Sequence, residues 1–215
     1  MTSSCHRHNA LLLLGATGAG KTPLGQLFQA RGLRGAPCLH FDFGANLREV
    51  VQHNQPDTIL SPADIDFLRG VLTSGALLED GEFPIARRIL QSFLARHAAA
   101  RQTVVVLNGL PRHAGQARAL ESLLDVRDVL YLVCAGETVF QRIQTNVGGD
   151  RTQRIDDSLE AVRHKLEIFH QRTTPLVDYY RAQGAVVREV EVRANTTAED
   201  IWRAVAEHAI PKGVT

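Results

Sequence analysis

The stretch Gly15-Ala16-Thr17-Gly18-Ala19-Gly20-Lys21-Thr22 directly follows the apolar run Ala10-Leu11-Leu12-Leu13-Leu14. It has the pattern G-x-x-x-x-G-K-[ST], which connects a buried strand to a helix and binds phosphate groups. The glycines let backbone N–H groups converge on phosphate oxygens with no Cβ in the way. We expect Lys21 to reach the β- and γ-phosphates and the Thr22 hydroxyl to bind Mg²⁺. The stretch therefore predicts a site for a nucleoside triphosphate with Mg²⁺.

Pro23 follows at a position that suits the first residue of a helix, where its missing N–H costs nothing. We predict a helix from Pro23 to about Ala30, with its positive end toward the nucleotide. The alternative, a tight glycine-rich turn without a ligand, leaves Lys21 beside Thr22 unexplained.

The composition favours one soluble globular domain. The chain has 215 residues, of which 44% are hydrophobic and 22% are charged. The formal net charge of +1 and the isoelectric point near 7.9 give no general attraction to nucleic acid or to acidic lipid. We therefore expect neither nucleic acid nor membrane as a partner, and phosphate binding must come from a local cluster of arginines.

The cysteines and the apolar runs predict the compartment. Cys5, Cys38 and Cys134 are far apart and form no C-x-x-C pair, which favours a reducing cytoplasm over a disulfide framework. No apolar stretch approaches the roughly 20 residues that cross a bilayer, and the leucine run is too short for a signal peptide. We expect a cytoplasmic protein that acts as a monomer.

Short apolar runs alternate with longer amphipathic segments, which is typical of a parallel sheet covered by helices. The predicted strands are residues 10–14, 38–41, 103–107, 129–133 and 186–192. The predicted helices are residues 23–30, 44–52, 62–73, 84–97 and 158–180, the last with a break near Pro175, and a final helix that opens at the capping sequence Thr196-Thr197-Ala198-Glu199 and runs to about residue 209.

Several segments resemble the adenylate kinase family. Residues 108–117, Asn-Gly-Leu-Pro-Arg-His-Ala-Gly-Gln-Ala, resemble its D-G-F-P-R-x-x-x-Q-A segment at the end of a central strand. Residues 43–48 (Phe-Gly-Ala-Asn-Leu-Arg) resemble T-G-D-x-L-R, and residues 75–78 (Gly-Ala-Leu-Leu) resemble the G-x-L-V turn beside the monophosphate base. Residues 154–157 and 174–180 are similar to the closing segment. The resemblance covers nearly the whole chain in the right order.

The resemblance implies an α/β fold of the P-loop kinase type, a three-layer sandwich with a five-stranded parallel sheet flanked by helices. It divides the single domain 1–215 into a core of residues 9–43, 76–144 and 155–210, a small monophosphate-binding insertion at about 44–75, and a short lid at about 145–154. The implied activity is transfer of the γ-phosphoryl of ATP·Mg to a nucleoside monophosphate, with AMP as the favoured acceptor.

The resemblance also assigns roles to single residues, and arginine suits phosphate because its planar fork binds two oxygens at once. Arg48 and Arg112 match residues that hold the acceptor phosphate, and Gln116 matches the amide that reads the adenine edge. Arg142 matches the residue over the donor base. The resemblance further places Gly44, Leu78 and Gly109 at the acceptor site and Arg154 in the lid. It implies that the catalytic residues are Lys21, Arg112, Arg154 and Lys165.

The chain departs from the family pattern at several of these positions. Asn108 replaces the aspartate that orients Mg²⁺-bound water; its amide oxygen can still accept, but it brings no negative charge. Asn146 and Lys165 replace arginines, and lysine keeps the charge while losing the fork. On the acceptor side, Phe43 replaces a threonine of the family and Ala45 replaces an aspartate.

These departures leave alternatives open. One is a nucleotide-binding regulatory or interaction protein of the same fold with weak or no transferase activity; another is a P-loop kinase for a different small acceptor. Arg151 either replaces a lid arginine or belongs to an ordinary turn. His40, Asp42 and His113 are expected near the site, but positioning and electrostatics, rather than a general base, perform the chemistry of such kinases.

Overall fold

The computed structural model describes residues 7–53, 60–97, 100, 102–150 and 158–207. The elements in chain order are β1 His8–Gly15, α1 Lys21–Arg31, β2 Cys38–Asp42, α2 Phe43–His53, α3 Pro62–Ser74, α4 Phe83–Arg96, β3 Val104–Asn108, α5 Ala114–Leu120, β4 Leu124–Val133, α6 Gly136–Thr145, α7 Leu159–Ile168, the π-helical segment η1 Phe169–Thr173, α8 Leu176–Ala182, β5 Val186–Glu191 and α9 Ala198–Glu207.

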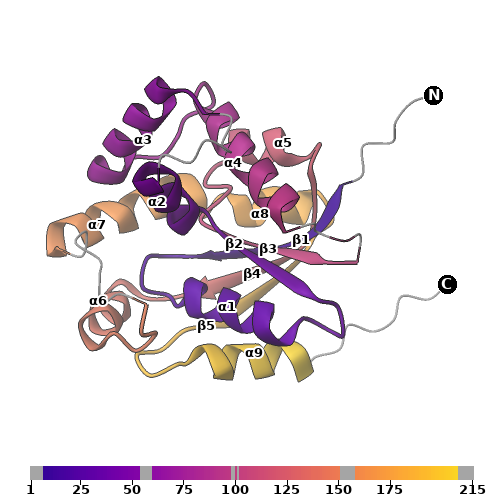
Figure 1. The fold of residues 1–215 in the computed structure, drawn as a ribbon. Coiled ribbons are helices and arrows are strands. Elements are labelled where there is room, and N and C mark those ends of the chain that lie inside the picture. The colour runs from indigo at the N-terminus through magenta and orange to yellow at the C-terminus, as the bar shows by residue number, and fades with distance from the viewer. Residues whose placement is uncertain (1–6, 54–59, 98–99, 101, 151–157, 208–215) are drawn as a thin grey trace.

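The five strands form one sheet in the order β2-β3-β1-β4-β5, and every neighbouring pair is parallel. Helices cover both faces: Figure 1 shows α1 and α9 below the sheet, with α4, α5 and α8 above it. This confirms the predicted α/β sandwich. Among the described residues, no helix is long and apolar enough to cross a membrane.

The leucine run of β1 explains how the sheet is held between two cores. Leu12 and Leu14 belong to the core under α4, α5 and α8, whereas Leu11 and Leu13 belong to the core shared with α1 and α9. A strand buried on both faces needs a continuous apolar run, because successive side chains point to opposite faces. The run therefore places β1 in the middle of the molecule and the loop after it at the sheet edge.

The strand order also brings the ends of β1, β2 and β3 together. Leu13 pairs in register with Asn108, and Asn108 pairs with Asp42 on its other side. In a parallel sheet the carboxyl ends of the strands share one edge, where ligands of α/β proteins bind. The residues that directly follow these three strands therefore lie together at this edge of the sheet.

Most element boundaries differ from the prediction by one or two residues, and β4 by five; three of the differences have a clear local cause. Helix α1 begins at Lys21, two residues before Pro23, because Gly20 adopts φ 95° and turns the chain into the helix at once. Strand β4 begins at Leu124, since Leu124 and Val126 alternate with charged residues that hide the strand pattern. The cap of α9 is formed by Thr197 and Asp200, one residue later than predicted.

The long predicted helix 158–180 is divided into α7, η1 and α8, so the break near Pro175 is confirmed and a π-helical turn precedes it. Residues 208–209 of the predicted last helix lie outside the described residues. Helices α5 and α6 were not predicted from the sequence. The insertion expected at 44–75 corresponds to α2 and α3, and its role stays a prediction.

Candidate functional site

The phosphate loop, residues 15–22, runs from the end of β1 into α1. Two residues of the loop, Ala16 and Ala19, are buried, so the loop packs against the core. Gly18 has φ 74° and Gly20 has φ 95°, a backbone region that residues with a Cβ rarely adopt. Lys21 Nζ donates hydrogen bonds to the carbonyls of Gly15 (2.8 Å) and Ala16 (2.7 Å). The ammonium group is therefore held across the loop, beside the N-terminus of α1, where anions are favoured.

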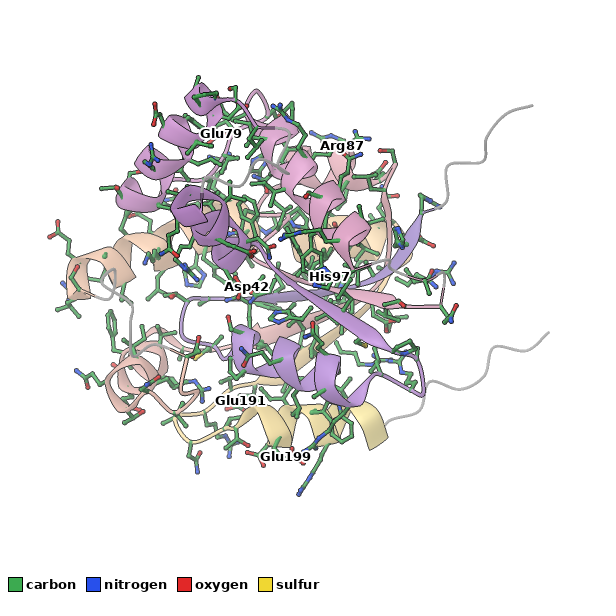
Figure 2. The ribbon with its side chains drawn as sticks, in the orientation of Figure 1. Asp42, Glu79, Arg87, His97, Glu191 and Glu199 are labelled. Atoms are coloured by element: carbon green, nitrogen blue, oxygen red, sulfur yellow. The ribbon has the colours of Figure 1, made fainter. Side chains whose placement is uncertain are left out.

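Three polar side chains from three elements meet beside the loop. The Thr22 hydroxyl donates to Asp42 Oδ2 over 2.8 Å, and Asn108 Nδ2 donates to the same oxygen over 2.8 Å. Asn108 Nδ2 also lies 3.0 Å from Thr22 Oγ1. Figure 2 labels Asp42 at the end of β2. From the sequence, Asp42 is expected near the site without a specific role, although a carboxylate at the carboxyl end of a half-buried strand is the signal that finds it.

A cavity of about 250 Å³ opens between the phosphate loop, α2, α3, the segment 75–78 and α7. It is lined by most of the residues that the sequence predicted for the site: Gly15, Thr17, Gly18, Gly20, Lys21, Thr22, Gly44, Arg48, Leu78, Asn108, Gly109, Arg112, Gln116 and Lys165. The structure therefore brings donor-side and acceptor-side predictions into one space. Arg154 and Arg151 lie outside the described residues.

Arg48 and Arg112 line this cavity. Within the described part of the chain, neither guanidinium makes a hydrogen bond or an ion pair. Most other described arginines are paired, as Arg172 is with Glu79 at 2.8 Å. Burial lowers the pKa of Arg112, although a guanidinium stays protonated. Two guanidinium groups that line one cavity, neither of them neutralised by a described side chain, favour an anionic ligand.

Gln116 is held by the chain itself. Its side chain is 1% exposed; Nε2 donates to the Leu78 carbonyl (2.8 Å), and Oε1 accepts from the Arg112 N–H (2.7 Å). His113 Nε2 lies 3.2 Å from the same carbonyl of Leu78. The amide thus joins the segment 75–78 to the start of α5. Its reading of a base stays a prediction, with one N–H and one oxygen lone pair left for that contact.

Arg142 lies behind the phosphate loop and does not line the cavity. Its side chain is 3% exposed and donates to the carbonyls of Gly18 (3.0 Å), Arg193 (2.7 Å) and Thr196 (2.7 Å). It therefore ties the loop to the segment that precedes α9. The predicted contact with the donor base is not tested by this arrangement and stays a prediction.

Two positions where this chain lacks an arginine of the family pattern, Asn146 and Lys165, lie toward the predicted lid. Asn146 ends α6 with φ 47°, in the left-handed region that asparagine tolerates. Lys165, on α7, lines the cavity. Positive charge on this wall is thus supplied by a lysine.

The donor set beside the loop suits a magnesium ion. Thr22 and Asp42 supply a hydroxyl and a carboxylate, which are oxygen ligands that Mg²⁺ prefers, and the ion keeps several waters and phosphate oxygens besides. Among the described residues, no group of three histidine, cysteine or acidic side chains forms a separate metal site. The residues present therefore fit a magnesium ion that arrives with a nucleotide.

Comparison with known proteins decides the family. No family model matches the chain. The adenylate kinase of Prochlorococcus marinus (strain MIT 9211) is 31% identical over 184 residues, which cover 83% of this chain and 86% of that protein. The chain belongs to the adenylate kinase family.

Two other adenylate kinases extend the match over more of the chain. That of Synechococcus sp. (strain RCC307) is 31% identical over 203 residues, covering 91% of this chain and 98% of that protein. That of Halobacterium salinarum is 29% identical over 225 residues, covering 93% of this chain and 95% of that protein. The resemblance seen in the motifs is thus confirmed, and the α/β sandwich is that of the P-loop kinases.

Proposed function

We propose that this adenylate kinase family member is a nucleoside monophosphate kinase, which transfers the γ-phosphoryl of ATP to a nucleoside monophosphate, with AMP as its first acceptor. The observation that carries the proposal is that Arg48 and Arg112, which pair with none of the residues that the structure describes, line the same cavity as the phosphate loop. A protein that binds only one nucleotide has no use for a second set of phosphate-binding cations.

On the donor side, the backbone N–H groups of the phosphate loop and the N-terminus of α1 bind the β- and γ-phosphates of ATP. Lys21 exchanges its bonds to the Gly15 and Ala16 carbonyls for bonds to phosphate oxygens. Thr22 and Asp42, with Asn108 hydrogen-bonded to both, would hold Mg²⁺, and the bound ion would offset the negative charge of the phosphate oxygens.

On the acceptor side, Arg48 and Arg112 hold the monophosphate with its oxygen in line with the γ-phosphoryl. A phosphate oxygen is already an anion near neutral pH, so the attack requires no general base. Positioning and electrostatic stabilisation supply the acceleration. Lys165 adds positive charge from α7, and we assign Arg154 of the lid to the transferring phosphoryl. Closure of residues 145–154 excludes water.

Adenine is the proposed acceptor base. The remaining N–H of Gln116 and the second lone pair of its oxygen complement the N6/N1 edge of adenine. Apolar side chains of α2 and α3, including Phe43, Leu47 and Val71, line the same cavity and suit a flat aromatic ring.

A coupled assay with ATP, Mg²⁺ and a panel of AMP, GMP, CMP and UMP tests the proposal. We expect two diphosphates per turnover with AMP and much lower rates with the other three. The matched variant Lys21→Ala keeps less than about a tenth of the parent rate, equivalent to about 1.4 kcal/mol of barrier, while its thermal melting matches the parent.

Each other outcome points to an alternative. ATP binding without any acceptor-dependent transfer favours a regulatory nucleotide-binding protein, as the uncharged Asn108 would suggest. A clear preference for another monophosphate removes Gln116 as an adenine reader. ATP consumption with a different small acceptor favours the kinase class that Phe43 and Ala45 suggested.

A further inference from the structure

Asn108 and Asp42 stand opposite each other at the ends of two paired strands. They are partners in the parallel register of β2 and β3, and their side chains meet at 2.8 Å. Thr22, the second residue of α1, contacts both. One negative charge is therefore present beside the threonine of the phosphate loop, although the position on β3 carries none.

The hydrogen bonds fix which atom of Asn108 faces the other two. Both carboxylate oxygens of Asp42 can only accept, and Oδ2 already receives the Thr22 hydroxyl. If the amide were reversed, two acceptor oxygens would face each other at 2.8 Å, which is repulsive. Asn108 therefore presents its N–H₂ group, which cannot bind a metal ion, to Thr22 and Asp42.

We propose that Asp42 supplies the carboxylate of the magnesium shell, directly or through a metal-bound water, and that Asn108 is a positioning residue that holds it there. Because the Thr22 hydroxyl donates its proton to Asp42 and accepts from Asn108 Nδ2 with one lone pair, the other lone pair of its oxygen is left for the ion. The neighbouring strand β2 thus supplies the negative charge that is missing at the end of β3. This inference rests on the proposed function, since it assumes a nucleotide that brings the ion.

Asp42 is also anchored on its other side. Its Oδ1 accepts from the Ala45 N–H over 2.9 Å, and its carbonyl accepts from Asn46 Nδ2 over 2.8 Å. These bonds cap the first turn of α2, so one carboxylate oxygen is fixed by the helix while the other faces the loop. The side chain is therefore preorganised, and asparagine, which also caps helices, preserves this anchor.

The experiment measures how strongly magnesium enhances binding of a non-hydrolysable ATP analogue, as the ratio of the Kd in EDTA to the Kd in excess Mg²⁺, by calorimetric titration without an acceptor. For Asp42→Asn we expect this ratio to fall about tenfold or more. In EDTA alone the variant should bind the analogue at least as tightly as the parent, because a negative charge near the phosphates has been removed.

Two further variants serve as controls. Asp150→Asn removes a carboxylate that lines the same cavity, and should leave the ratio within about twofold of the parent because of solvent screening. The double variant Asp42→Asn/Asn108→Asp has its carboxylate at the end of β3 instead of β2, and it should recover most of the lost magnesium enhancement of analogue binding. This recovery also shows that the single variant is not merely misfolded.

The inference is overturned if Asp42→Asn keeps the parent ratio, or if Asp150→Asn loses as much. If the parent transfers phosphoryl groups and binds the analogue with magnesium enhancement while Asp42→Asn is unchanged, the inference alone fails. If the parent does not bind the analogue at all, the proposed function and the inference fail together.

Discussion

At the scale of single residues, the contact between Gly25 and His40 shows how tightly α1 lies against β2. A Cβ built on Gly25 would stand 2.2 Å from His40 Nε2. Glycine inside a helix costs about 1 kcal/mol relative to alanine, so its presence in α1 has a packing reason. The missing side chain of Gly25 makes room for the ring of His40.

We expect Gly25→Ala to lower the free energy of unfolding by about 1–3 kcal/mol, despite the better helix propensity of alanine, because the ring is overpacked. Urea denaturation measures this. In a His40→Ala background the same substitution should be neutral or stabilising, since the obstructing ring is gone. A Gly25→Ala protein more stable than the parent would mean that the ring moves aside without strain.

His40 also predicts a pH dependence. Burial lowers the pKa of His40 below its ordinary value, and the nearby negative charge of Asp42 opposes this only in part. Nε2 is buried and has no hydrogen-bond partner among the described residues. Because the folded protein holds the neutral ring, the unfolded chain binds the extra proton first as the pH falls.

The resulting stability is fully present above the ordinary histidine pKa of about 6.5, and it is lost as the pH falls from there toward the lowered folded value. We expect the free energy of unfolding to decrease as the pH falls below about 6.5, with a shallower decrease in His40→Leu, which cannot titrate. Urea denaturation at several pH values checks this. Parallel slopes for the two proteins would contradict it.

At the scale of elements, α3 depends on a complete capping box. Ser61 Oγ accepts from the Asp64 N–H (3.1 Å), and Asp64 Oδ2 accepts from the Ser61 N–H (2.9 Å). Hydrogen bonding from Ser61, followed by the charge of Arg88, holds the pKa of Asp64 below its usual range. Since Val71 and Leu72 of α3 line the cavity, this cap supports one wall of the site.

We expect Ser61→Ala to lower the free energy of unfolding by about 1 kcal/mol, whereas Ser61→Asn, which keeps an acceptor at the cap, changes it by much less. Thermal or urea unfolding of the three proteins measures the difference. Equal losses in both variants would show that the side chain of Ser61 contributes through packing rather than through the cap.

The elements also show which parts of a fold can be predicted from a sequence. β1 and the start of α3 were predictable because a continuous leucine run and a Ser-Pro cap each act locally. The full length of β4 was not, because its first half alternates apolar and charged residues and is defined by pairing with β1. The π-helical turn η1 likewise depends on packing, here of the buried residues Phe169 and Thr173, rather than on local propensity.

At the scale of the whole molecule, the proposed function assigns one part of the cavity to the donor and another to the acceptor, and this predicts unequal effects of substitution. Arg48→Ala and Arg112→Ala should each weaken AMP binding by about 1.5–3 kcal/mol, the range for a hydrogen bond to a charged group, and ATP binding by far less. Calorimetric titration of the two nucleotides measures both.

Arg172→Ala is the matched control, because this arginine is paired with Glu79 on the surface and does not line the cavity. It should leave both affinities near those of the parent. Equal losses of AMP and ATP binding in the Arg48 and Arg112 variants would remove these residues from the acceptor site.

The site as a whole was predictable only in part. Its motifs named most of the lining residues, because three of the motifs follow the ends of β1, β2 and β3, which the topology carries to one edge. They did not predict that the Gln116 amide is already bonded to Leu78 and Arg112, or that Arg142 lies behind the loop. Such hydrogen bonds join residues far apart in the chain, so no local pattern encodes them.

The register between β2 and β3 has a consequence for how such proteins are recognised. Because the last residues of the two strands are direct partners, a side chain from either one reaches the same point beside Thr22. A search pattern that requires an acidic residue at the end of β3 would classify this chain as defective. A pattern that treats positions 42 and 108 as one unit, and asks for a single carboxylate in the pair, would retain it.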